Sequence, residues 1–145
     1  MLTILIVDDN AHLQIAFKKW LTVAGYKVQL ASDGEEGLRW ALANMPDVIV
    51  LDMLLPKLSG LDVLRALKRN SEASRIPVIA LSGLPMSNES KLIREGAISY
   101  LEKSMLVDPE FLLRAIDYAL LLPRGDEFRS DAFLSNVQQA SKITF

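Results

Sequence analysis

The chain has 145 residues, 50% of them apolar and 23% charged, a length and composition that suit one compact domain with a sizeable core. The net charge of −2 argues against bulk attraction to nucleic acid or anionic membranes. The absence of cysteine excludes disulfides and thiolate metal sites, and no apolar run approaches the roughly 20 residues that span a bilayer. We therefore expect a soluble, cytoplasmic protein.

Five short apolar runs predict five β-strands, over residues 4–7, 26–30, 48–51, 78–81 and 97–101. Three of the runs are continuous, a pattern typical of strands that are covered on both faces in a parallel sheet. The second run alternates apolar with polar residues, as an edge strand with one wetter face does.

Helical spacing fills the segments between these strands, and most of them carry a start or stop signal. The first helix is expected to end at Gly25, a residue suited to a left-handed cap. The second opens with a capping-box pattern at Ser32–Glu35 and is halted by Pro46. The fifth has Asp108 as its cap. The segments expected to be helical are 13–24, 32–45, 60–67, 87–96 and 109–122.

Five alternations of strand and helix favour a doubly wound, five-stranded parallel sheet with helices on both faces. We assign residues 1–122 to this domain. Residues 123–145 form a C-terminal tail in which Ser130 precedes apolar residues at helical spacing, and the tail is expected to hold one short helix. In such sheets the ligand site lies beyond the carboxyl ends of the strands, where the strand order reverses.

Polar residues follow four of the five predicted strands. Asp8 and Asp9 follow the first, Asp52 the third, Ser82 the fourth and, slightly further on, Lys103 the fifth. Taken singly, the acids suit helix caps or turns, and Ser82 and Lys103 suit a solvated surface. Their convergence on one edge of the sheet is what indicates a functional site.

Three carboxylates packed together repel one another, and a bound divalent cation is the cheapest relief at neutral pH. Oxygen ligands without histidine or cysteine indicate a hard ion, and Mg²⁺ is usually held by carboxylates, waters and a phosphate. Lys103 would then supply a positive charge for a phosphoryl oxygen and Ser82 a hydrogen-bond donor. One carboxylate must receive the phosphoryl group.

These residues resemble a known family. The Asp8-Asp9 pair, the Asp52–Pro56 stretch with Gly60 four residues on, Ser82-Gly83, and Tyr100 three residues before Lys103 look like the receiver domain of two-component response regulators, similar to chemotaxis regulators. The resemblance covers about residues 2–122. It implies a flavodoxin-like (βα)5 fold and a signalling protein rather than an enzyme.

The resemblance also implies a role for each residue. Asp52 would accept a phosphoryl group from a histidine kinase or a histidine phosphotransfer protein. Asp8 and Asp9 would form the acidic pocket for Mg²⁺, with Asp52 and the backbone carbonyl of Leu54. Lys103 would pair with the phosphoryl group. Ser82 and Tyr100 would form the switch, and the face built by the fourth helix, fifth strand and fifth helix would carry the signal.

Two features depart from the family pattern or modify it. Ser104 follows Lys103, whereas the family usually has proline there, with a cis peptide bond. A cis bond to a non-proline residue costs about 2.5 to 4 kcal/mol, so either this bond is trans and the loop differs, or strain is retained. The apolar side chains of Leu54 and Leu55 line the approach to Asp52 and are expected to affect how readily water attacks a phosphoaspartate.

The segment 109–122 is more apolar than burial against a sheet requires. Either the tail covers the excess or this helix forms a homodimer surface. The tail is too short for a DNA-binding domain and lacks a basic face, so direct binding to nucleic acid is not expected, nor is binding to a membrane. The chain reads as a stand-alone receiver, although one cut from a longer protein would look almost the same.

Two other functions fit parts of the pattern. A pseudo-receiver would keep the fold and bind partners without phosphorylation, but all the expected site residues are present. A flavin- or nucleotide-binding protein of similar fold would want a glycine-rich turn after the first strand, and no glycine occurs before Gly25.

Overall fold

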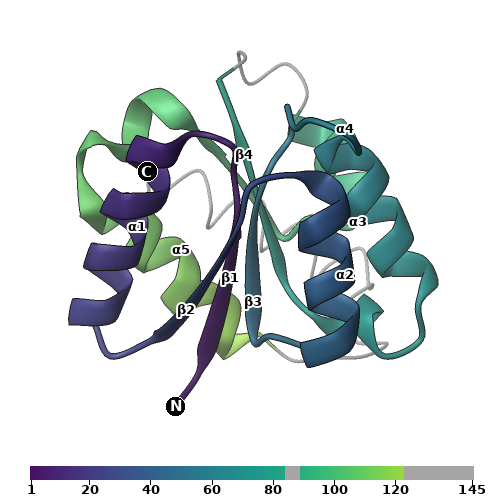
Figure 1. The fold of residues 1–145 in the computed structure, drawn as a ribbon, viewed down its shortest axis with the longest axis horizontal. Helices are drawn as coiled ribbons and strands as arrows, with labels where there is room; N and C mark the ends of the chain where they lie inside the picture. Colours follow the sequence, from purple (N-terminus) through teal and green to yellow (C-terminus); the bar gives the residue numbers. More distant parts are fainter. Residues whose placement is uncertain (84–88, 123–145) are drawn as a thin grey trace.

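The computed structural model describes residues 1–83 and 89–122 (Figure 1). The expected helix in the tail, 123–145, and the expected start of the fourth helix near Ser87 lie outside the described residues. No helix within the described ranges is long and apolar enough to cross a membrane. The elements run in the order β1 (Thr3–Val7), α1 (Ala11–Val23), β2 (Lys27–Ala31), α2 (Gly34–Asn44), β3 (Val48–Asp52), α3 (Gly60–Arg69), η1 (Ala73–Arg75), β4 (Val78–Ser82), α4 (Glu89–Arg94), β5 (Ser99–Glu102), η3 (Lys103–Val107) and α5 (Pro109–Leu121).

The five strands form one parallel sheet in the order β2-β1-β3-β4-β5, which confirms the predicted doubly wound architecture. Helices α1 and α5 cover one face, and α2, α3 and α4 cover the other (Figure 1). Strand β1 lies between β2 and β3, so the strand order reverses there. This places the carboxyl ends of β1 and β3 side by side at the upper edge of the sheet in Figure 1.

The helix ends follow local chemistry. Gly25 adopts φ +99° just after α1, as the predicted left-handed cap requires. Asp108 caps α5 by accepting a hydrogen bond from Glu110 N–H at 3.0 Å, and Pro109 is the first helical residue. Helix α5 ends at Leu121 because Leu122 precedes a proline and is held in an extended conformation, with ψ 142°.

Most of the predicted boundaries differ from the observed ones by one or two residues, and two of these differences have a clear physical cause. The cap of α2 is Asp33, not Ser32, because the Asp33 carboxylate accepts the Glu36 N–H at 2.8 Å. Strand β5 begins at Ser99, although the apolar run begins at Ala97. Ala97 and Ile98 are fully buried as the chain enters the sheet from α4, so their apolar character reflects burial just ahead of the strand.

The apolar excess of α5 is largely taken up by the core. Its fully buried side chains include Leu112 and Ile116, and half-buried neighbours such as Phe111 and Tyr118 pack against the same cluster. Leu121, in contrast, is 82% exposed at the end of the helix. Whether the tail or a second copy covers this end of α5 stays a prediction.

The start of α3 lies directly against the end of β3. Gly60 N–H donates to the carbonyl of Met53 at 3.1 Å. A Cβ at position 60 would overlap the Asp52 carbonyl oxygen and lie 2.6 Å from Met53 Cα, both of which are backbone atoms that cannot rotate away. Only glycine therefore lets α3 close onto the strand that carries Asp52.

We expect Gly60→Ala to lower the free energy of unfolding by about 2–4 kcal/mol, because backbone must shift to admit the methyl group. Urea denaturation measures this loss. Gly83→Ala is the matched control, since a Cβ there meets nothing within 4 Å. Equal stability of the two variants would contradict the close approach of α3 to β3.

Candidate functional site

Three carboxylates meet at the carboxyl edge of the sheet. Asp8 directly follows β1 and Asp52 is the last residue of β3, and their exposed fractions are 0% and 2%. Asp9 is exposed beside them. One carboxylate oxygen from each residue lies within 4.8 Å of the other two. The predicted acidic cluster is therefore formed.

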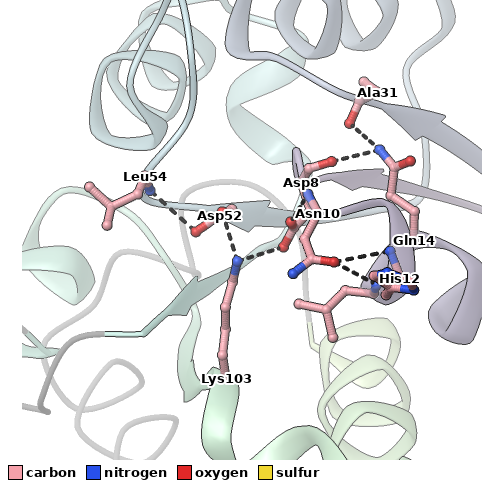
Figure 2. A network of polar contacts seen from close by, with 9 residues as sticks. Asp8, Asn10, His12, Gln14, Ala31, Asp52, Leu54 and Lys103 are labelled. Carbon is pink, nitrogen blue, oxygen red and sulfur yellow. Dashed lines mark hydrogen bonds and ion pairs between the residues drawn. The ribbon is translucent and has the colours of Figure 1, made fainter.

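Lys103 reaches into this cluster from the end of β5. Its Nζ lies 2.9 Å from Asp52 Oδ2 and 3.0 Å from Asp8 Oδ2, so one ammonium bridges both buried acids (Figure 2). The peptide bond between Lys103 and Ser104 is trans, and Lys103 starts the 3-10 helix η3. Of the two alternatives left open by the sequence, the trans bond is the one observed, and it still brings the ammonium to the acids.

The backbone orients both buried carboxylates. Asn10 N–H donates to Asp8 Oδ1 at 2.8 Å, and Leu54 N–H donates to Asp52 Oδ1 at 3.2 Å (Figure 2). Each acid thus has one oxygen bound to main chain and the other directed at Lys103. The Leu54 side chain is 62% exposed, so its apolar surface lies open to solvent two residues after Asp52.

Burial and neighbouring charges have opposing effects on the pKa values of Asp52 and Lys103. Burial raises the pKa of Asp52, and the negative charge of Asp8 adds to the rise, while the hydrogen bonds from Lys103 and Leu54 N–H only partly offset it. Burial by itself would lower the pKa of Lys103, but its hydrogen bond to Asp52 and its ion pair with Asp8 outweigh that effect and raise it. When all groups are ionised, three carboxylates face one ammonium.

The residues present fit a hard divalent cation. Asp8 Oδ2 is fully buried and accepts no well-aligned hydrogen bond, although the Lys103 ammonium lies 3.0 Å away as an ion pair. Its lone pairs are therefore available. The cluster offers only carboxylate oxygens, which suit Mg²⁺ better than metals that prefer nitrogen or sulfur. Asp8, Asp9 and Asp52 could hold such an ion.

The two expected switch residues lie on the neighbouring strands. Ser82 ends β4, next to β3, and Tyr100 is in β5 opposite Ala80. Both side chains are 3% exposed, and Tyr100 packs in the core cluster on the α2–α4 side of the sheet. The structure thus places Ser82 at the same sheet edge as Asp52 and Tyr100 inside the fold, and their roles stay predictions.

The sequence interpretation missed two residues of this network. Asn10 caps α1 by accepting hydrogen bonds from His12 N–H and Leu13 N–H, a role readable from an asparagine just before a helix. Gln14 bonds the carbonyls of Asp8 and Ala31 (Figure 2). Nothing in the sequence singles out Gln14, because a glutamine in an amphipathic helix is ordinarily a solvated residue.

Comparisons with known proteins agree with this arrangement. Residues 4–117 match the family model described as the response regulator receiver domain. The polar-differentiation response regulator DivK of Brucella anthropi is 34% identical over 111 residues, which cover 76% of this chain and 89% of that protein.

Solved structures of response regulators have the same fold as this chain. A response regulator receiver domain protein from Clostridium thermocellum superposes with a TM-score of 0.75 at 36% identity, covering 83% of this chain and 94% of that one. Chemotaxis protein CheY4 of Vibrio cholerae superposes with a TM-score of 0.76 at 29% identity, covering 83% and 99% of the two chains.

The raised pKa of Asp52 predicts a stability gain when its charge is removed. The folded protein holds the Asp52 proton more tightly than the unfolded chain, so ionisation begins to destabilise the fold above pH 3.8 and does so fully above the folded pKa. In EDTA at pH 7 we expect Asp52→Asn to raise the urea midpoint, with a gain that shrinks as the pH falls toward 4.

Glu72→Gln is the control for this prediction, because Glu72 is an exposed acid beside η1, at the opposite edge of the sheet. We expect no comparable gain from it. A lower urea midpoint for Asp52→Asn than for the unmodified protein in EDTA at pH 7 would contradict the prediction. It would mean that the ion pair with Lys103 stabilises the fold more than burial and repulsion of the Asp52 charge destabilise it.

Proposed function

Because this chain belongs to the response regulator receiver domain family, we propose that it is a phosphorylation-activated switch in which Asp52 accepts the phosphoryl group. One observation carries the proposal. The Asp52 carboxylate is buried at the strand-order reversal, 2.9 Å from the Lys103 ammonium and beside two further acids. A buried carboxylate beside a fixed ammonium is held in position to attack a phosphoryl group, and the two further acids would hold the cation that neutralises the added charge.

The proposed reaction needs a positioned nucleophile and neutralisation of charge, and little other chemistry. An Asp52 oxygen attacks the phosphorus of a phosphohistidine, the P–N bond breaks as the O–P bond forms, and the histidine nitrogen takes up a proton. Lys103 would pair with a phosphoryl oxygen. The Mg²⁺ ion, held by Asp8, Asp9, Asp52 and the Leu54 carbonyl, would supply further positive charge. The same groups would assist a slow return to the unphosphorylated state.

The proposed switch depends on a change in charge beside Ser82. An acyl phosphate places new anionic oxygens at the end of β3, next to the strand that Ser82 ends. The Ser82 hydroxyl would donate to one of them, and Tyr100 would respond to its movement. The face of α4, β5 and α5 would then present the phosphorylated state to a partner.

The partners we propose are a histidine kinase or a histidine phosphotransfer protein as the phosphodonor, in the cytoplasm. A homodimer through α5 is a further proposal, which would cover the exposed Leu121. Residues 1–122 would carry the switch, with 123–145 as an appended tail.

We expect acetyl phosphate with Mg²⁺ to produce a phosphorylated species that migrates more slowly on a phosphate-affinity gel. Asp52→Asn should give no shifted band, because it removes the carboxylate that we propose as the acceptor, whereas Glu72→Gln should shift as the unmodified protein does. Absence of a shift in the unmodified protein would favour a scaffold that binds partners without phosphorylation.

We further expect Asp9→Asn to weaken Mg²⁺ binding by at least about tenfold, because it removes one charged ligand from a set of three. Isothermal titration calorimetry measures the affinity directly, and Glu72→Gln should leave it unchanged. Equal affinities for all three proteins would mean that Mg²⁺ does not bind at the acidic cluster.

A further inference from the structure

We infer that Gln14 is a positioning residue for the acidic cluster: by fixing the peptide between Asp8 and Asp9, it sets the affinity of the site for Mg²⁺. This inference rests on the proposed Mg²⁺ binding but does not require phosphorylation. The hydrogen bonds of Gln14 go to main-chain carbonyls and to Ser32, and not to the carboxylates of the acidic cluster or to Lys103. Figure 2 shows the two bonds to carbonyls.

The Gln14 side chain connects three segments. It lies half-buried on α1, and its Nε2 is 2.6 Å from the Asp8 carbonyl oxygen, 3.2 Å from the Ala31 carbonyl oxygen and 3.2 Å from Ser32 Oγ. An amide nitrogen has two hydrogens, so it serves two of these acceptors at a time, and the shortest contact is to Asp8. Both carbonyls are acceptors only, so the opposite amide orientation would bring oxygen against oxygen.

The Asp8 carbonyl belongs to the peptide unit that joins Asp8 to Asp9. The tilt of that unit determines the direction in which the Asp9 side chain leaves the backbone. The Asp8 N–H is already fixed to the Ala31 carbonyl at 3.0 Å, and Asp8 Oδ1 is bound to Asn10 N–H. The Gln14 bond fixes the remaining group, the Asp8 carbonyl. Without it, the peptide unit could rotate and carry Asp9 away from Asp8 and Asp52.

Mg²⁺ binding is sensitive to such rotation. The ion demands nearly ideal octahedral geometry at short ligand distances, so ligands that are not pre-positioned lose affinity. Loss of a residue that orients a metal ligand typically costs 10- to 100-fold in metal affinity. Gln14 orients the main chain between two of the three acids, so we expect its removal to weaken Mg²⁺ binding by a factor in this range.

Two substitutions separate positioning from charge. Gln14→Met keeps the length of the side chain and removes the donor. Gln14→Glu is nearly the same shape, but it sets a carboxylate against two carbonyl oxygens and adds a negative charge near the site. By charge alone, Gln14→Glu would strengthen Mg²⁺ binding, whereas positioning predicts that both variants bind Mg²⁺ about tenfold more weakly.

Tyr26→Phe controls for a general loss of stability. It removes a hydrogen bond of similar kind, from Tyr26 Oη to Asp117 Oδ1 at 2.8 Å, which joins the start of β2 to α5. This variant should lower the urea midpoint and leave Mg²⁺ affinity unchanged.

Saturating Mg²⁺ should restore the acetyl phosphate reaction of Gln14→Met, because the reacting groups themselves are intact.

Isothermal titration calorimetry with MgCl₂ on the full chain gives the deciding result. Tenfold weaker binding by Gln14→Met, with Tyr26→Phe unchanged, supports the inference, and Gln14→Met decides alone if Gln14→Glu does not fold. Unchanged affinity in Gln14→Met, or stronger binding by Gln14→Glu, overturns it. Weakened binding without any phosphorylation of Asp52 would support the role of Gln14 while refuting the proposed function, and failure of the unmodified protein to bind Mg²⁺ would refute both.

Discussion

The structure of the site depends on one ammonium group held between two buried carboxylates. Lys103 Nζ lies about equally close to Asp8 and Asp52, and it is the cation that offsets their repulsion within the described residues. A buried acid without a partner would lose its charge, since removing it from water is costly. Lys103 favours the ionised form of Asp52, but burial and the charge of Asp8 still raise the pKa of that carboxyl, so the compensation is incomplete. The site is therefore prepared for more positive charge.

The fold brings these groups together through the order of its strands. Because β1 and β3 are neighbours, Asp8 directly after β1 and Asp52 at the end of β3 lie close together, although they are 44 positions apart in the chain. The main chain then fixes the direction of each acid through Asn10 N–H and Leu54 N–H. Gly60 allows α3 to pack onto the end of β3, so the loop after Asp52 cannot relax outward. The strand order brings the two buried acids close together, and these local contacts determine how their side chains are oriented.

The sequence predicted the features that depend on short-range patterns. Continuous apolar runs identified the buried strands, and Asp108 and Gly25 marked helix ends because capping is a local interaction. The acids and Lys103 were found because each directly follows a strand in a fold with a known binding edge. Gln14 was not found, since its importance comes from two carbonyls, of Asp8 and Ala31, whose positions relative to α1 exist only in three dimensions. The trans bond at Lys103 was likewise undecided, because the energy of one peptide bond does not reveal how the rest of the loop adapts.

The same charge balance indicates how phosphorylation would act on the fold. Ionised Asp52 holds its negative charge on the carboxylate, within 2.9 Å of Lys103. An acyl phosphate would move that charge outward onto the phosphoryl oxygens, so Lys103 would have to follow the charge or stay with Asp8. Lys103 is the first residue of η3, which directly joins β5 to the loop before α5. A movement of Lys103 would therefore act on the short backbone segment that leads into α5. A ligand shifts a conformational equilibrium only as far as its contacts differ between the two states. In the proposed switch, the contact that would differ is the one between Lys103 and Asp52.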